Sequence, residues 1–353
     1  MFDFPPVLAA YGWDELFETA FAPHRDAGMV PGRVAGVDRG RCDVITEQGL
    51  VRAGTFRPDD PLLAPCTGDW AVLRPGGQPV LTAILPRRTA IVRSSASGRS
   101  QGQVLAANVD TVAITVSLAV PVDLGRVERL LALAWESGAR PVIVLTKADL
   151  IDDTGPVEVD VAAAAPGADV VALSATTGQG LDAAATLLTG TVVLIGPSGA
   201  GKSTLANALL GEARLATGAV RESDGKGRHT TVRRELLPLP AGGVLIDTPG
   251  LRGVGLWDAA DGLRQTFADI EELAEQCRFG DCEHRTEPDC AVLAAIEDGV
   301  LTRRRLGSYH KLLRENEWIA SRTDARLRAE RDNRYKAISR SLRQKYRIEG
   351  RKP

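Results

Sequence analysis

Apolar and polar positions partly alternate in four short runs between residues 33 and 86, with the period of half-buried β-strands. Turn signals such as Asp38-Arg39-Gly40 separate these runs. Short strands broken by turns at close intervals are typical of a small antiparallel barrel, so we expect an OB-like β-barrel over residues 31–95. Such barrels bind nucleic acid in some proteins and act as spacers in others, and the pattern allows both. Residues 1–30 are expected to form a short N-terminal extension.

The pattern changes over residues 96–262, where apolar runs rich in β-branched residues precede segments of helical periodicity. Continuous apolar strands followed by helices indicate a parallel sheet with helices on both faces. We therefore expect an α/β domain here. Its strands are expected at residues 111–120, 141–146, 169–174, 191–196 and 242–246.

Residues 263–353 have a helical pattern, interrupted by a Cys/His cluster and ending in two long helical stretches at 301–322 and 324–346. From residue 301 onward there are 17 Lys and Arg but 6 Asp and Glu, whereas the preceding 300 residues have a net charge of −13. A basic tail on an acidic body indicates a polyanionic partner such as RNA. The alternative is that the basic side chains, beginning with Arg303, Arg304 and Arg305, pack against the acidic body of the same chain.

The composition is that of a folded protein with several buried cores, because 44% of its 353 residues are hydrophobic and 25% are charged. No run approaches the roughly eighteen apolar residues of a membrane span. The first residues lack the basic and then apolar order of a secretory signal. Five cysteines in a chain of this length do not form a disulfide scaffold. We expect a cytoplasmic, monomeric protein without a membrane partner.

Residues 196–203 read Gly-Pro-Ser-Gly-Ala-Gly-Lys-Ser, a complete phosphate-binding loop motif between an apolar strand and a helical segment. Its glycines allow the backbone N–H groups to surround phosphate oxygens at a helix N-terminus. Lys202 is expected to reach the β- and γ-phosphates, and the Ser203 hydroxyl is expected to ligate Mg²⁺. The predicted phosphate-contacting residues are Gly196, Ser198, Gly199, Ala200, Gly201, Lys202, Ser203 and Thr204.

A second phosphate motif, Asp247-Thr248-Pro249-Gly250, follows the apolar strand at 242–246. A carboxylate at the carboxyl end of a strand suits a water-mediated contact to Mg²⁺, and Gly250 offers a backbone N–H to the γ-phosphate. By itself this is an ordinary turn sequence. About forty residues after a phosphate loop, it predicts a second phosphate-sensing segment.

Two further strand ends provide candidates for base recognition. Asp149, in Thr146-Lys147-Ala148-Asp149, can accept hydrogen bonds from the N1–H and N2–H₂ groups of guanine, a contact that adenine cannot make. Lys147 is expected to lay its aliphatic part over the base, and Ser174 and Ala175 to support the base from the other side. Guanine-binding proteins usually have Asn where this chain has Thr146, so an ATP-using enzyme remains the alternative.

The order of these motifs is unusual. In a conventional GTPase the phosphate loop precedes the base motifs, but here residues 146–149 and 174–176 precede residues 196–203. All the parts are present, which indicates a circularly permuted GTPase domain over residues 96–262. In this order the segment after Asp247 leads directly into the C-terminal helices.

The Cys277-x4-Cys282-x-His284-x5-Cys290 cluster gathers three of the five cysteines and one of the four histidines. Three thiolates and one imidazole form a closed tetrahedral set, which suits a structural Zn²⁺ ion rather than a catalytic one. A group of reduced thiols without metal is the alternative. We predict a zinc-binding helical domain over residues 263–353.

The motif order, the Gly225–Thr231 segment (Gly-Lys-Gly-Arg-His-Thr-Thr) and the Cys/His spacing together resemble the RsgA/YjeQ family of circularly permuted bacterial GTPases. This resemblance covers nearly the whole chain. It implies GTP hydrolysis to GDP and phosphate that the small ribosomal subunit stimulates, a role in late maturation of that subunit with rRNA as a partner, and one zinc ion. A third Thr often ends the family segment, whereas this chain has Val232.

The Gly225–Thr231 loop lies where the first switch of a GTPase belongs. We expect Thr230 to be the second protein ligand of Mg²⁺, with Thr231 as the alternative, and Lys202, Thr230 and His229 to act in catalysis. His229 positions water or contacts the partner, or it is an ordinary exposed histidine in a flexible loop. Leu251 stands where many GTPases have a water-orienting Gln, so intrinsic hydrolysis should be slow. A second class of function is an RNA-binding assembly factor whose nucleotide is only a structural ligand.

Overall fold

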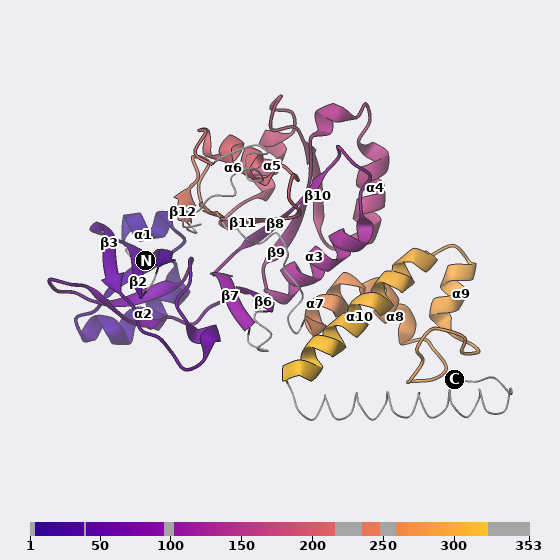
Figure 1. Ribbon diagram of the computed structural model, residues 1–353, viewed down its shortest axis with the longest axis horizontal. Coiled ribbons are helices and arrows are strands. Elements are labelled where there is room, and N and C mark those ends of the chain that lie inside the picture. The colour runs from indigo at the N-terminus through magenta and orange to yellow at the C-terminus, as the bar shows by residue number, and fades with distance from the viewer. Residues whose placement is uncertain (1–3, 39, 95–101, 216–234, 248–258, 324–353) are drawn as a thin grey trace, which may run out of the picture.

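The computed structural model describes residues 4–38, 40–94, 102–215, 235–247 and 259–323. They form a barrel, a central α/β domain and a C-terminal group of helices, which succeed one another along the long axis of the molecule (Figure 1). The expected fold class is therefore confirmed. None of the helices in this part of the chain is both long and apolar enough to span a lipid bilayer.

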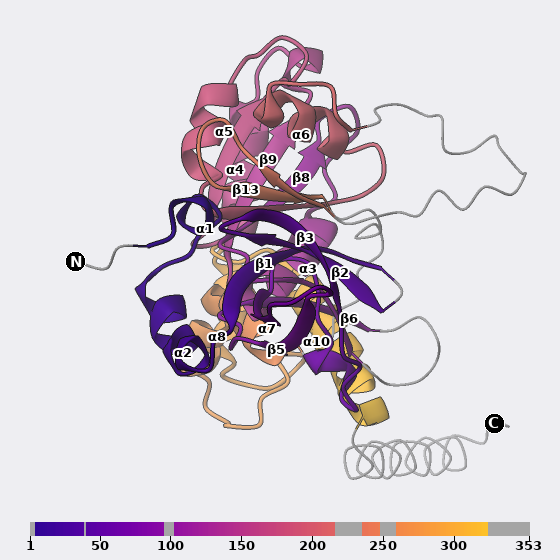
Figure 2. The ribbon, with the colours of Figure 1, turned by 90° about the vertical axis from the view of Figure 1, so that its left-hand side faces the viewer.

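The barrel is closed and its five strands are arranged in the order β1-β2-β3-β5-β4, which Figure 2 shows from one side. The strands are β1 (Val30–Asp38), β2 (Arg41–Thr46), β3 (Gly49–Gly54), β4 (Trp70–Arg74) and β5 (Val80–Ile84). A short 3₁₀ turn, η1 (Pro61–Leu63), lies between β3 and β4. The barrel interior is filled mainly by small and branched side chains such as Val34, Val44 and Leu73.

The N-terminal residues pack on the outside of the barrel as two helices, α1 (Pro6–Ala10) and α2 (Glu15–Asp26). Asp14 begins α2 by accepting hydrogen bonds from the backbone N–H groups of residues 16 and 17. Several of the chain's few aromatic side chains meet here. The ring of Trp13 lies edge-on to Trp70 at a centroid distance of 4.8 Å and also contacts Phe17 and Phe21.

The central sheet has six strands in the order β10-β9-β8-β11-β13-β12, all parallel except β12. Its strands are β8 (Thr111–Ser117), β9 (Arg140–Thr146), β10 (Asp169–Leu173), β11 (Thr191–Ile195), β12 (Glu235–Pro238) and β13 (Val244–Asp247). Along the chain, β9 and β10 are added on one side of β8, and β11 then pairs with the other side of β8. The adjacent carboxyl ends of β8 and β11 therefore form the switch point where open α/β sheets bind ligands.

Helices cover both faces of this sheet, as its continuous apolar strands predict. One face packs against α3 (Leu124–Glu136) and α4 (Gly155–Ala164). The other face packs against α5 (Leu181–Leu187) and α6 (Lys202–Leu210). Figure 1 shows these two pairs of helices on opposite sides of the strands.

A separate two-stranded ribbon, β6 (Ala90–Ser94) with β7 (Gly102–Ala107), connects the barrel to the sheet. Beside it, the fully buried Arg33 of the barrel joins the two parts. Its guanidinium donates to Thr191 Oγ1 of β11 at 2.8 Å, to Asn108 O at 3.1 Å and to the carbonyl of Tyr11. Burial lowers the pKa of Arg33 to about 10.

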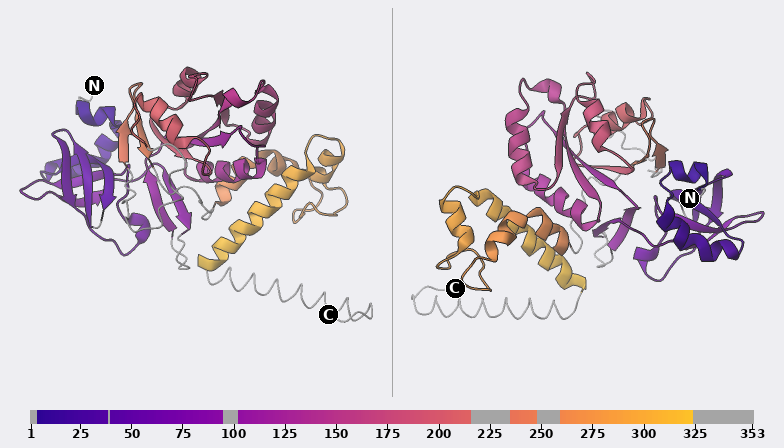
Figure 3. Two further views of the ribbon diagram at one scale, coloured as in Figure 1. Left: turned by 45° about the horizontal axis from the view of Figure 1, so that its top comes forward. Right: turned by 180° about the vertical axis from the view of Figure 1, so that it is seen from behind.

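The C-terminal helices are α7 (Ala260–Thr266), α8 (Ala268–Ala274), α9 (Ala291–Glu297) and α10 (Arg303–Thr323). Of these, α7 and α10 pack on α3, whereas α8 packs on α7 and α9. Gly262 allows α7 to approach α3 closely, because a Cβ at this position would lie 2.0 Å from the Ala132 carbonyl oxygen. Gly262 N–H donates to Glu136 Oε2 at 2.8 Å. Figure 3 shows α10 along the outside of this group.

Two arginines of the basic C-terminal part form ion pairs with acidic residues of the same chain, as the alternative interpretation of the tail predicts. Arg305 donates to Glu128 Oε1 at 2.9 Å and to Asp269 at 2.6 Å. Arg304 donates to the same Glu128 at 3.0 Å. These ion pairs join α10 to α3, so Arg304 and Arg305 bind the chain itself. The positions from residue 324 onward lie outside the described residues.

Candidate functional site: a nucleotide crevice and a metal loop

The phosphate loop is shaped by glycines that no other residue could replace without strain. After the buried strand β11, Gly196 has φ 146° and lies so close to Thr115 that a Cβ would be 2.4 Å from the threonine Oγ1. Gly199 and Gly201 also have positive φ, 78° and 80°. Gly201 then forms the N-cap of α6. The loop wraps around the N-terminus of α6, where free backbone N–H groups favour an anion.

Lys202 lies over this loop. Its ammonium group donates to the carbonyl oxygens of Gly196 at 2.8 Å and Pro197 at 2.6 Å. The positive charge is therefore already held at the mouth of the loop. Ser203, in the first turn of α6, is partly exposed, and its hydroxyl could ligate Mg²⁺.

Thr146 connects the base-binding strand to the phosphate loop. It ends β9 and is 3% exposed, and its hydroxyl lies 2.9 Å from the carbonyl oxygen of Ala200 in the loop. The carbonyl of Val116, at the end of β8, lies 3.2 Å from the same hydroxyl. From the sequence, Thr146 stands out only as a departure from Asn, and this contact could not be predicted because no local pattern links positions 146 and 200.

The two base motifs lie side by side. β9 and β10 pair in parallel with Leu173 opposite Thr146, so Lys147 and Ser174 follow at the same edge of the sheet. Lys147 has a left-handed backbone (φ 61°), which turns the chain into the 3₁₀ turn η2 (Ala148–Leu150) and leaves Asp149 exposed. The fully buried Ser174 accepts a hydrogen bond from the N–H of Thr177 at 3.2 Å, which orders the turn that carries Ala175.

A cavity of about 330 Å³ lies at this switch point, between the end of β8, the start of α3 and the phosphate loop. Lys147 lines it together with Ser198, Gly199 and Ala200 of the loop. Lys147 of the base motif and the phosphate loop therefore border one space, whereas Asp149 and Ser174 are not among its lining residues. The expected switch residues Thr230, Thr231, His229, Gly250 and Leu251 lie outside the described residues. Asp247 is described as the last residue of β13, next to β11 in the sheet.

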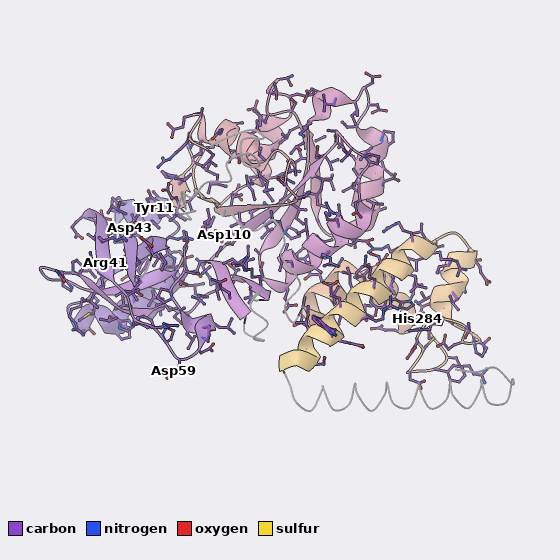
Figure 4. All side chains as sticks on the ribbon, viewed as in Figure 1. Tyr11, Arg41, Asp43, Asp59, Asp110 and His284 are labelled. Carbon is purple, nitrogen blue, oxygen red and sulfur yellow. The ribbon has the colours of Figure 1, made fainter. Side chains whose placement is uncertain are left out.

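The Cys/His cluster lies in the C-terminal helical part, far from the barrel, and Figure 4 labels its histidine. The ligand atoms of Cys277, Cys282, His284 and Cys290 all lie within 4.8 Å of one another. Cys277 Sγ is 3.8 Å from Cys290 Sγ, and His284 Nδ1 is 3.4 Å from Cys290 Sγ. Zinc bonds of about 2.3 Å to sulfur and about 2.0 Å to nitrogen give tetrahedral edges of about 3.5–3.8 Å. These two edges match that geometry, and the four donors together could hold one metal ion.

Glu287 orders the backbone around the histidine ligand. Its carboxylate accepts hydrogen bonds from the N–H groups of Arg285 at 2.7 Å, Thr286 at 2.9 Å and Glu283 at 3.0 Å. These bonds lower the pKa of Glu287 to about 2. Burial lowers the pKa of His284, which favours the neutral imidazole that binds metal. Glu287 could not be predicted from the sequence, because nothing in the local sequence distinguishes it from other acidic residues in this polar loop.

Comparisons with known proteins agree with this arrangement. Residues 84–257 match the model of the RsgA GTPase family. A Streptomyces coelicolor protein named small ribosomal subunit biogenesis GTPase RsgA is 60% identical over 94% of this chain and 92% of its own length. The chain belongs to the RsgA GTPase family. A protein of the same name from Opitutus terrae is 43% identical over 98% of this chain and 99% of its own length.

Two solved structures share the fold of this chain. The crystal structure of YjeQ from Thermotoga maritima has a TM-score of 0.60 and 26% identity, covering 82% of this chain and 98% of that one. The structure of YloQ, described as a circularly permuted GTPase, has a TM-score of 0.57 at 24% identity and covers 82% of this chain and 95% of its own. Membership of the RsgA family makes this protein a GTP hydrolase, as the sequence motifs predict.

Proposed function

We propose that this GTPase acts in late maturation of the small ribosomal subunit, with GTP hydrolysis stimulated by the subunit and rRNA as part of its partner. The observation that carries the proposal is the meeting of the Lys147 segment and the phosphate loop at one cavity, in a chain whose relatives are named for small-subunit biogenesis. A factor of this kind works where ribosomes are assembled, in the cytoplasm, and we expect it to act as a monomer.

In this proposal the backbone N–H groups of residues 196–204 hold the phosphates of GTP, and Lys202 moves from the loop carbonyls to the β- and γ-phosphates. Ser203 and Thr230 hold Mg²⁺, which neutralises charge on those phosphates when bound. Asp247 and Gly250 sense the γ-phosphate, and His229 positions the attacking water or contacts the partner. Asp149 binds the guanine edge while Lys147, Ser174 and Ala175 flank the base.

Hydrolysis without the partner should be slow because Leu251 cannot hydrogen-bond a water molecule. The small subunit then supplies or positions the missing polar group. In the GTP state the two switch segments favour subunit binding, and hydrolysis releases the protein.

We further propose that Cys277, Cys282, His284 and Cys290 hold one Zn²⁺ ion with a structural role. Four protein ligands leave no open position for water, and the loop between residues 277 and 290 is too polar to fold without a crosslink. Bound zinc would fix this loop between α8 and α9.

The test is GTP turnover measured against increasing concentrations of purified small or large ribosomal subunits. We expect strong stimulation by small subunits alone, lost in Lys202→Ala. Equal rates with and without small subunits would refute the proposal. ATP binding as tight as GTP binding, with no change of preference in Asp149→Asn, would favour an ATPase. A Ser203→Ala variant that still binds and leaves ribosomes normally would favour a structural nucleotide.

A further inference from the structure

One face of α10 has cations that the fold itself does not use. Helical geometry places residues separated by three or four positions on one face, so Arg303, Lys311, Arg314 and Trp318 form a single stripe with Gly307 between them. All five are exposed, Trp318 to 49%. We call these five residues the α10 stripe. Figure 1 shows α10 in front of α7 and α8, which pack on its other side.

The inward and outward cations of α10 differ in their partners. Arg304 and Arg305 are neutralised by Glu128 and Asp269. Arg303, Lys311 and Arg314, by contrast, form no ion pair with any residue in the described ranges. Intramolecular ion pairs therefore account for Arg304 and Arg305, whereas none within the described ranges accounts for the other three cations.

We propose that the α10 stripe binds the phosphate backbone of RNA, with Trp318 stacking on an unpaired base. The inference rests on the proposed function and adds the surface that contacts the RNA. Arg and Lys at successive helical turns can each neutralise a phosphate, and the Arg forks bind phosphate oxygens in pairs. A half-exposed indole beside such cations is the combination that holds single-stranded nucleic acid. An acidic protein surface is the competing partner.

The test compares the full chain, loaded with a non-hydrolysable GTP analogue, with the triple variant Arg303→Gln/Lys311→Gln/Arg314→Gln. Affinity for intact small subunits and for the bare rRNA extracted from them is measured at several salt concentrations. The logarithm of the binding constant falls linearly with the logarithm of the salt concentration. For single strands, each lost phosphate contact makes this slope smaller by about 0.7. We therefore expect the triple variant to bind at least tenfold more weakly to both probes, with a slope smaller by about two.

The control is Arg41→Gln/Arg57→Gln/Arg74→Gln, which removes three exposed barrel cations that likewise lack an ion pair in the described ranges. Both triple variants should retain the turnover of the wild type without subunits, which also shows that they fold. Trp318→Ala should weaken binding to bare rRNA about fivefold or more without changing the salt slope.

An α10 triple variant that binds both probes as tightly as the wild type would overturn the inference, and so would an unchanged salt slope, which would indicate a protein partner. A wild-type chain that binds neither probe would also overturn it. Binding of the wild type to bare rRNA but not to small subunits would refute the proposed function while the stripe still binds RNA.

Discussion

Replacing Thr146 with Val tests whether the contact between β9 and the phosphate loop supports nucleotide binding. Valine has nearly the same shape but no hydroxyl. The substitution therefore removes the hydrogen bond to the Ala200 carbonyl and leaves that carbonyl unpaired. Ala200 is 1% exposed, so water cannot replace the lost partner without local rearrangement.

The size of the effect follows from that burial. An unsatisfied buried carbonyl costs about 1–3 kcal/mol, and about 1.4 kcal/mol corresponds to a tenfold change in affinity. If the ordered loop is what binds phosphate, Thr146→Val should weaken GDP and GTP binding by roughly 5- to 150-fold. Thr146→Ser keeps the hydroxyl and should remain within about threefold of the wild type.

Titration calorimetry tests this prediction by measuring the affinities for GDP, GTP and xanthosine triphosphate (XTP). Since the hydroxyl of Thr146 binds the loop rather than the base, all three nucleotides should weaken by a similar factor. Asp149→Asn should instead change the ratio between GTP and XTP. The reasoning fails if Thr146→Val leaves GDP affinity unchanged, or if it alters base preference as Asp149→Asn does.

Three further predictions concern stability and the metal loop. Arg305→Met should lower the free energy of unfolding in urea by about 3–5 kcal/mol, because it leaves the fully buried Glu128 carboxylate with only the exposed Arg304. Arg305→Met/Glu128→Met should recover much of that loss, and a double variant less stable than the single one would contradict this account. Glu287→Ala should reduce zinc affinity about tenfold or more in a chelator competition, because it frees three backbone N–H groups around His284. An equal reduction of zinc affinity in Asp281→Ala, which changes an exposed neighbour, would argue against that role. Burial raises the pKa of Cys42 to about 11 in the folded chain, so the thiol ionises at a lower pH in the unfolded chain. The free energy of unfolding should therefore fall by about 1 kcal/mol between pH 8 and pH 10. Cys42→Ala should lessen this fall, and an unchanged pH dependence would show that another group causes it.

Much of the fold could be predicted from local pattern. The alternation of residues 33–86 and the apolar runs of the central domain are short-range signals, and the structure has the barrel and the parallel sheet that they predict. The Cys/His spacing likewise predicted a set of four donors that meet in space. The roles of Thr230, His229 and Asp247 remain predictions, as do the domain boundaries.

Other features could not be predicted, because they depend on which surfaces meet. The extension before residue 31 gave no clear pattern, yet its aromatic side chains complete a cluster on the barrel around Trp70. The basic tail had two interpretations, and only the position of α3 beside α10 shows that Arg304 and Arg305 face Glu128 while Arg303 faces outward. A charge count cannot distinguish these faces.

The sequence by itself determined the candidate chemistry of this protein: a phosphate loop, a predicted guanine motif placed ahead of it and a closed set of four candidate metal ligands. Each of these is a group of residues close together in the chain, where spacing alone restricts what the side chains can do. The tertiary structure decided how the groups are joined, through Thr146 to Ala200 across the sheet edge and Arg305 to Glu128 between helices. Such contacts connect positions more than fifty residues apart, and they form only when packing brings the surfaces together.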